Sequence, residues 1–269
     1  MTEDFLSGTS GQVGGIRGTS RAVLADARDD GLAWARLLPP RLRQAARTLP
    51  PRRVLALSVV HDDRPTLIAA ARAELATSRH QVQLAQIAVG GQGKFENLNQ
   101  LLRRHPVDAV DWLLVLDDDV RLPRGFLDTF LFLAERFELS LAQPAHRRRS
   151  HAAWAITRRR TGAVVRETRF VEIGPVFAFH RRTFETLLPF PPQRYGWGLD
   201  VHWSALAAQR GWRLGIVDAT PVAHGIRRIA TGYSRDDAMA EARSFLAGRP
   251  YVPREQALLV IAEHRNWRH

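Results

Sequence analysis

Strand-like runs alternate with amphipathic stretches through the middle of the chain. The runs are rich in leucine and β-branched residues and end in polar or glycine-rich segments, which is typical of strands in a buried parallel sheet. The predicted strands are 54–60, 82–89 and 112–116. Apolar residues at helical spacing follow each strand and predict helices at 66–78, 95–104 and 125–137. This alternation predicts a doubly wound α/β fold, with helices flanking a mostly parallel central sheet.

The pattern after residue 137 is less regular, and we see no internal repeat. Further strands are predicted at 139–142, 169–179 and 212–217. Further helices are predicted at 181–188, 199–210 and 235–246. We therefore expect the main domain, 51–269, to end in a C-terminal helical segment at 235–269.

The N-terminal region has a different composition. Residues 1–20 are rich in Gly, Ser and Thr, and residues 21–48 carry apolar positions at roughly helical spacing. The pair Pro39-Pro40 interrupts this stretch, and the pair Pro50-Pro51 follows it. We expect residues 1–50 to form an extension that is first flexible and then helical, and that packs on the main domain or on a partner, which leaves a homodimer open.

Composition narrows the classes of function. The 269 residues carry 39 Lys+Arg and 27 Asp+Glu, for a net charge of +12, and Lys94 is the one lysine. The charge suits a nucleic acid, an anionic membrane surface or an anionic small substrate, and does not choose among them. With no cysteine, the sequence excludes a disulfide scaffold, a thiol nucleophile and a Cys-ligated metal. No apolar stretch approaches the roughly 20 residues of a membrane span, and the start does not resemble a secretory signal, so we expect a cytoplasmic protein.

Three carboxylates follow the predicted strand 112–116. Ligands of open α/β sheets bind just outside the carboxyl ends of strands. Asp117 and Asp119 should point to one side and Asp118 to the other. Two such carboxylates can hold a hard divalent cation, which would neutralise a diphosphate. The alternative is a polar strand end with an Asp cap for the next helix.

Three other segments carry candidate chemistry. Gly90–Gly93 precedes a helix and could receive an anion, with Lys94 as a point charge on phosphate, or be an ordinary turn. Trp197, between two glycines, could lie at the wall of a sugar pocket or in the core. Asp200 could be a general base or a helix N-cap. His224 could be a third metal ligand or a structural histidine.

Taken together, these elements resemble the GT-A glycosyltransferases, notably the family 2 and galactosyltransferase-like branches. The resemblance covers about residues 52–230. Its motifs are Ser58–Asp63, Gly91–Lys94, the DxD motif Asp117–Asp119, Trp197–Asp200 and His224. It implies a GT-A, Rossmann-like fold, with the nucleotide-sugar-binding half at 51–120 and the acceptor half at 121–234.

The resemblance also implies roles for individual residues. Asp117, Asp119 and His224 would bind Mn²⁺ or Mg²⁺, and Asp200 would be the catalytic base of an inverting enzyme. The implied donor-binding residues are Ser58, Asp62, Asp63, Lys94, Asn97, Asp117, Asp118 and Gly174. Tyr195 and Trp197 would contact the acceptor. The family's usual Glu-Asp pair is Leu199-Asp200 here, and its second acidic turn is replaced by Gly90-Gly91.

The sequence therefore predicts a metal-dependent, inverting glycosyltransferase of the hexosyltransferase type. It would move a sugar from a nucleotide-diphosphate sugar to a hydroxyl of a glycan, glycolipid or small molecule. A retaining glycosyltransferase or a sugar nucleotidyltransferase is the alternative enzyme, and a basic nucleic-acid or membrane-binding module is the non-enzymatic one.

The role of two arginine triplets, Arg147–Arg149 and Arg158–Arg160, is not decided by this prediction. They could form a solvated face, contact an anionic acceptor or the inner face of a membrane, or bind nucleic acid. No RNA- or DNA-binding motif accompanies them, so nucleic acid is the least favoured of these partners.

Overall fold

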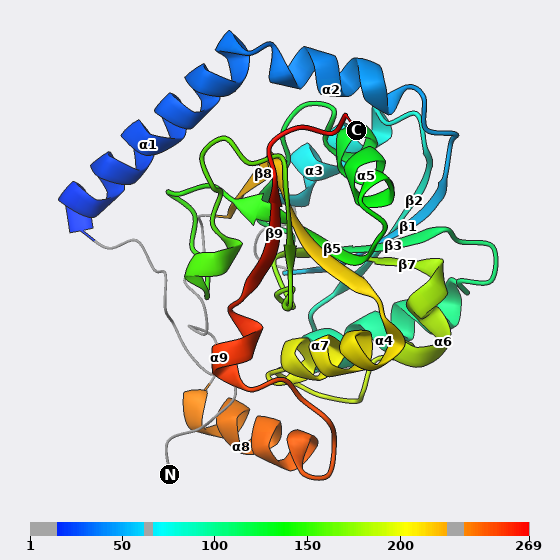
Figure 1. Ribbon diagram of the computed structural model, residues 1–269. Coiled ribbons are helices and arrows are strands. Elements are labelled where there is room, and N and C mark those ends of the chain that lie inside the picture. The colour runs from blue at the N-terminus through cyan, green and yellow to red at the C-terminus, as the bar shows by residue number, and fades with distance from the viewer. Residues whose placement is uncertain (1–14, 62–66, 225–233, 269) are drawn as a thin grey trace.

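In the computed structural model, described over residues 15–61, 67–224 and 234–268, a nine-stranded sheet forms the centre (Figure 1). The strands are β1 (Arg53–Val60), β2 (Gln81–Ala88), β3 (Trp112–Leu116), β4 (Val120–Arg121), β5 (Leu139–His146), β6 (Val165–Thr168), β7 (Val176–His180), β8 (Arg213–His224) and β9 (Val260–His264). The order is β2-β1-β3-β7-β5-β8-β6-β9, and β4 pairs with β8 outside this path. Along the path only β7 and β6 run against the other six strands, so the described sheet is mostly parallel.

Helices cover both faces of the sheet. They are α1 (Gly15–Ala35), α2 (Leu38–Ala46), α3 (Leu67–Ala76), α4 (Lys94–Arg104), α5 (Phe126–Arg136), α6 (Phe184–Leu187), α7 (Leu199–Arg210), α8 (Arg235–Leu246) and α9 (Arg254–Ala257). Successive side chains of a strand point to opposite faces. Leu55 and Leu57 of β1 therefore join a core with α4, α7 and α8, whereas Val54 and Ala56 join a core with α2, α3 and α5.

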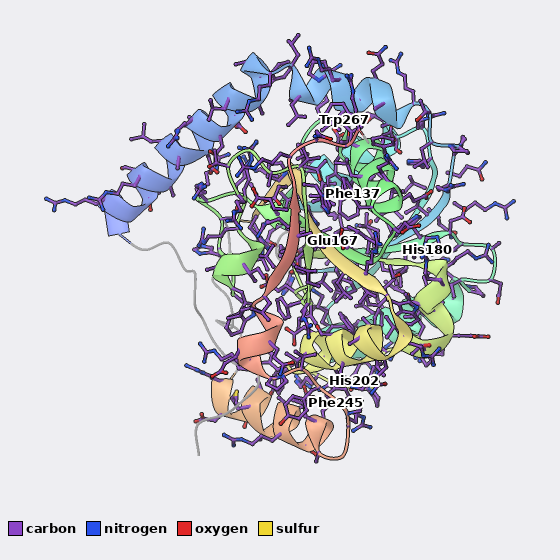
Figure 2. All side chains as sticks on the ribbon, viewed as in Figure 1. Phe137, Glu167, His180, His202, Phe245 and Trp267 are labelled. Carbon is purple, nitrogen blue, oxygen red and sulfur yellow. The ribbon has the colours of Figure 1, made fainter. Side chains whose placement is uncertain are left out.

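Helix α8 closes the lower end of the first core. Its Phe245 packs edge-on against His202 of α7, with ring centroids 5.3 Å apart (Figure 2). Burial lowers the pKa of His202, and this effect outweighs the hydrogen bond to the carbonyl oxygen of Pro250. The side chain of Leu246 in α8 also lies next to Gly198, the N-cap of α7, so α8 packs against the first turn of α7.

Several predicted elements match the structure and others do not. Strand 112–116 and helices 199–210 and 235–246 have the predicted bounds. The single strand predicted at 169–179 is wrong, because residues 169–175 leave the sheet between β6 and β7. Pro175 lacks the N–H that a ladder position donates, which favours a break there.

The C-terminal segment is only partly helical. After α8 and α9 the chain returns to the sheet as β9 and pairs with β6 at its edge. Leu259 and Ile261 there are 49% and 61% exposed. An apolar run this short does not distinguish an edge strand from a helix in the sequence.

The arginine triplets bind α1 and other parts of the chain. Asp26, 1% exposed, accepts hydrogen bonds from the backbone N–H groups of Arg148 (2.8 Å) and Arg149 (3.2 Å). The remaining pairs are Arg147 with Asp30, Arg148 with Asp29, Arg149 with Asp26, Arg158 with the carbonyl of Arg148, Arg159 with Asp30 and Arg160 with Glu263. Each of the six arginines thus has a partner within the chain, a role that the sequence analysis did not consider.

A buried ion pair ties β6 to β8. The Arg166 guanidinium meets the Asp218 carboxylate in two hydrogen bonds of 2.8 and 2.9 Å, and both side chains are almost fully covered. Burial raises the pKa of Asp218, although Arg166 acts in the opposite direction. The pair also receives the backbone N–H of Arg160, so it fixes the second triplet against the sheet.

No helix among residues 15–61, 67–224 and 234–268 has the length and apolar character that crossing a bilayer requires.

Candidate active site

The acidic segment after β3 lies against the start of α4. The Nζ of Lys94 donates to Oδ1 of Asp117 at 2.6 Å and to the carbonyl oxygen of Ile173 at 3.2 Å. A Cβ at Gly174 would lie 3.2 Å from that Nζ and 3.4 Å from Oδ2 of Asp117. Three residues predicted to bind the donor, Lys94, Asp117 and Gly174, are therefore side by side.

Asp118 points away from this group, as the strand geometry predicts. Its Oδ2 accepts the backbone N–H of His61 at 2.9 Å and lies 3.3 Å from Nδ1 of the same residue. The carboxylate is 1% exposed and joins the carboxyl ends of β1 and β3. Its predicted contact with the donor stays a prediction.

Asp119 and His224 meet two residues further along the segment. Oδ1 of Asp119 lies 3.1 Å from Nε2 of His224, and β4 pairs with β8 at this level. The hydroxyl of Ser150 accepts the backbone N–H of His224, and the N–H of His151 donates to its carbonyl oxygen. Burial lowers the pKa of His224, but Asp119, Asp117 and Glu172 more than compensate and raise it.

The spacing of Asp119 and His224 is compatible with a shared divalent cation. Two ligand atoms about 2.1 Å from one ion, at a right angle, are about 3 Å apart, which agrees with the Asp119–His224 distance of 3.1 Å. Asp117 is engaged by Lys94, and in the described part of the chain no three His, Asp or Glu side chains form a metal-binding group. Two side chains thus fit the ion, and the other ligands would come from substrate or water.

Asp200 is the second residue of α7 and is 6% exposed. The N-cap of this helix is Gly198, with φ of 91°, so Asp200 does not have the N-cap role considered from the sequence. Its Oδ1 accepts the N–H of Val201 at 2.9 Å. Burial raises the pKa of Asp200 to about 7, and the charge of Glu172 acts in the same direction. A carboxylate with this pKa can take up a proton near neutral pH.

Glu172 is the residue of this region that the sequence analysis missed. It lies in the segment that leaves the sheet after β6 and is 7% exposed. Its Oε1 accepts the N–H of Ala153, and its Oε2 lies 3.3 Å from Nε2 of His146. Its charge raises the pKa of both Asp200 and His224. An acidic residue within the apolar run 170–173 was the available signal.

The glycine loop packs on the loop before α7. A Cβ at Gly93 would lie 2.3 Å from the backbone of Arg194, so only glycine allows this approach. The Asn97 amide is buried and donates to the carbonyl oxygens of Val89 and Gln92. In this structure Asn97 therefore holds the loop that carries Lys94.

The acceptor residues predicted from the sequence lie in the loop that Glu241 fixes. The Glu241 carboxylate accepts the backbone N–H groups of Arg194, Tyr195 and Gly196. Tyr195 and Trp197 are half-buried, and Trp197 packs against the core of the α7 face. Ser58, predicted to bind the donor, is fully buried in β1. Asp62 and Asp63 lie outside the described residues.

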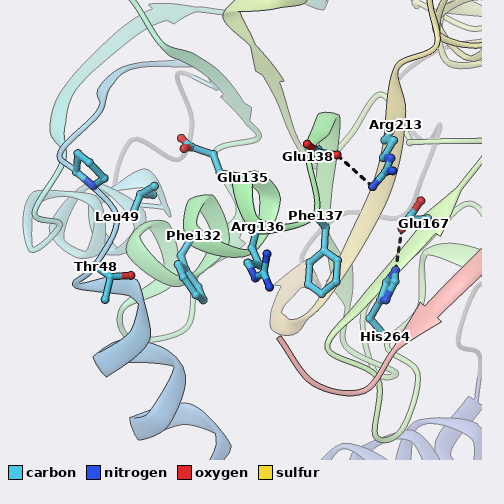
Figure 3. A pocket seen from close by; sticks show the side chains of 11 residues that line it. Thr48, Leu49, Phe132, Glu135, Arg136, Phe137, Glu138, Glu167, Arg213 and His264 are labelled. Atoms are coloured by element: carbon cyan, nitrogen blue, oxygen red, sulfur yellow. Dashed lines mark hydrogen bonds and ion pairs between the residues drawn. The ribbon is translucent and has the colours of Figure 1, made fainter. Parts of the chain in front are cut away.

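A separate pocket of about 570 Å³ opens beside β9 (Figure 3). Its walls include Phe132, Phe137 and the ion pair between Glu167 and His264. None of the residues predicted for the active site lines it. The pocket is therefore distinct from the cluster around Asp117 and Asp200.

Comparisons with known proteins place the fold. No protein-family model matches the sequence, and no curated protein does. Among solved structures 95 chains match, including the crystal structure of GalNAc-T7 with UDP, GalNAc and Mn²⁺. That match has a TM-score of 0.51 and 13% identity, covering 73% of this chain and 48% of the other. The chain thus spans about half the length of that protein, and the likeness confirms the predicted GT-A, Rossmann-like fold.

Proposed function

We propose that this protein is a glycosyltransferase that moves a sugar from a nucleotide-diphosphate sugar to a hydroxyl acceptor. The observation that carries the proposal is the group of charged residues around the carboxyl end of β3, contributed by the start of α4 and the end of β8, with Asp200 of α7 linked to it through the charge of Glu172. It combines Lys94, the Asp119–His224 pair and a buried carboxylate with a raised pKa. Ligands bind at this edge in open α/β sheets, and the fold is that of a protein crystallised with UDP, GalNAc and Mn²⁺.

The donor side of the site suits a diphosphate. Lys94 can move from Asp117 to a phosphate oxygen, because its ammonium is a compact charge on a flexible chain. Asp119 and His224 would hold Mn²⁺ or Mg²⁺. When bound, that cation would neutralise the negative charge that develops on the leaving diphosphate. Glycine at position 174 keeps a side chain away from Lys94 and Asp117, and the sugar-bearing end of the donor would lie next to this position.

The acceptor side depends on Asp200. Its pKa of about 7 makes it a base that can accept the proton of an acceptor hydroxyl as the oxygen attacks the sugar. A direct attack opposite the leaving diphosphate inverts the anomeric carbon. Glu172 strengthens the base, because its negative charge disfavours ionisation of Asp200 and so raises the affinity of that carboxylate for a proton.

The first test is ligand-induced stabilisation. UDP, GDP and dTDP would be tested separately with Mn²⁺, with Mg²⁺ and with EDTA. A nucleoside diphosphate that fits should raise the free energy of unfolding by about 2.7 kcal/mol at 100 times its Kd. Lys94→Ala should remove this stabilisation, whereas Arg103→Ala, an exposed position on the same helix, should keep it. If no diphosphate stabilises the chain with either metal, the proposed donor class is wrong.

The second test concerns the reaction. Asp200→Asn should abolish transfer and keep diphosphate binding, because the amide preserves the shape of the side chain but cannot take up the proton. Equal loss of transfer and binding would mean that Asp200 is structural. The anomeric configuration of the product tests inversion directly, and release of pyrophosphate in place of a nucleoside diphosphate would identify a nucleotidyltransferase.

A further inference from the structure

Helix α1 turns its acidic residues toward the protein and its apolar residues toward solvent. Asp26 and Asp29 are 1% and 5% exposed, and together with Asp30 they bind the arginine triplets. The exposed large apolar residues of α1 and of the turn that follows are Val23 (41%), Leu24 (70%), Leu32 (39%), Trp34 (54%) and Leu37 (52%). A surface helix ordinarily has the opposite arrangement, with its apolar stripe facing the core.

The outward face of α1 has two parallel rows. Leu24, Ala27, Gly31 and Trp34 follow one another at helical spacing, and all four are exposed. Beside them runs a second exposed row, Arg17, Arg21 and Arg28. Since all three acidic residues of this helix face the protein, the outer surface is apolar and positively charged.

This face is also placed for contact with a surface. Figure 1 shows α1 at the outer edge of the molecule, joined to α2 and reaching beyond the helices that cover the sheet. The Arg43 guanidinium of α2 lies 6.0 Å from the centre of the Trp34 ring and adds another cation next to the apolar row. The ion pairs of Asp26, Asp29 and Asp30 hold the helix in this orientation.

The charge pattern of α1 favours a lipid surface over a second copy of this chain as the partner of its outward face. A two-fold contact with a second copy would bring the same face of α1 against itself, so the arginine row would meet arginines and no carboxylate of the helix. An anionic lipid surface accepts both rows. Apolar side chains enter the boundary between headgroups and acyl chains, and arginines bind the headgroup phosphates. We propose that the outward face of α1 binds an anionic membrane surface.

The test is sedimentation of the full chain with vesicles. One set contains phosphatidylcholine alone, and the other contains phosphatidylcholine with phosphatidylglycerol. The protein should bind the anionic vesicles and lose binding at high salt. Arg17→Gln/Arg21→Gln/Arg28→Gln should weaken binding on the order of 100-fold, because each arginine near such a surface contributes about fivefold.

The apolar row has its own variant. Leu24→Ser/Trp34→Ser should weaken binding about tenfold or more. These substitutions leave the aspartates of α1 untouched, so circular dichroism and thermal unfolding should match those of the unmodified chain.

Matched controls lie on other surfaces. Leu259→Ser/Ile261→Ser removes two exposed apolar side chains from the edge near β9, and Arg103→Gln/Arg104→Gln/Arg265→Gln removes three exposed arginines. Both variants should bind vesicles like the original protein.

Three outcomes would overturn the proposal. The first is no binding to anionic vesicles, and the second is equal loss of binding in the control variants. The third is a dimer in lipid-free buffer that Leu24→Ser/Trp34→Ser dissociates, because a second copy would then occupy the face.

Discussion

Replacing Asp200 by asparagine should make the protein more stable at alkaline pH. The carboxyl has a pKa of 3.8 in an exposed setting and about 7 in the fold, because burial disfavours its charged form. Between these values the folded protein keeps a proton that the unfolded chain has lost. The free energy of unfolding therefore falls by about 1.4 kcal/mol for each pH unit in this window. Asparagine carries no such proton, and its carbonyl oxygen can still accept the N–H of Val201.

The magnitude follows from the part of the window that an experiment can use. Between pH 5 and pH 8 only the two pH units below the folded-state pKa of about 7 lie inside the window. The difference in free energy of unfolding between the variant and the original protein should therefore grow by about 3 kcal/mol. Urea unfolding at both pH values measures the difference, and contributions of other titrating groups cancel in it. Asp236→Asn removes the same charge from an exposed position of α8, where burial does not penalise it, and should show no such growth. A difference for Asp200→Asn that stays constant from pH 5 to pH 8 would refute the reasoning.

Three further predictions concern the surroundings of the site. Gly93→Ala should destabilise the protein by about 1–3 kcal/mol in urea unfolding, because its Cβ would lie 2.3 Å from backbone atoms, whereas Gly91→Ala meets nothing within 4 Å and should change little. Arg166→Ala should cost about 3–5 kcal/mol in the same assay, because it leaves a buried carboxylate without its counter-charge. Glu172→Gln should lower the pKa of Asp200, so the rise of kcat/KM with pH should move to lower pH. An unshifted profile would contradict the interaction between the two carboxylates.

The sequence identified residues whose positions follow from a local rule. Asp117 follows β3, and Lys94 begins the helix after β2, which runs parallel to β3 with β1 between them, so both should lie at the same edge of the sheet. The structure joins them by a hydrogen bond of 2.6 Å. Alternation along the strand also predicts that Asp118 turns away from Asp117, as the structure has it.

The role of Glu172 and the partners of the arginine triplets depend on contacts between distant parts of the chain, which the local sequence pattern does not predict. Glu172 approaches Asp200 only because residues 169–175 leave the sheet, and the sequence analysis treated that segment as a strand. The role of the arginine triplets could not be chosen from the sequence because their partners are distant: Arg148 and Asp29 are 119 positions apart. A pattern of charges along the chain cannot predict which of them pair in the fold.

The Asp26 contacts have a consequence for any shortened form of this protein. The sequence separates residues 1–50, as an extension, from the main domain 51–269, so a chain starting at residue 51 would be a natural choice for expression. Yet Asp26 binds the backbone of Arg148 and Arg149, and the next two residues, Ser150 and His151, hold His224. Such a chain would keep every residue proposed for the active site. It would lose the Asp26 contacts that hold the segment next to His224 in place. The unit to express and compare is therefore the chain that includes α1.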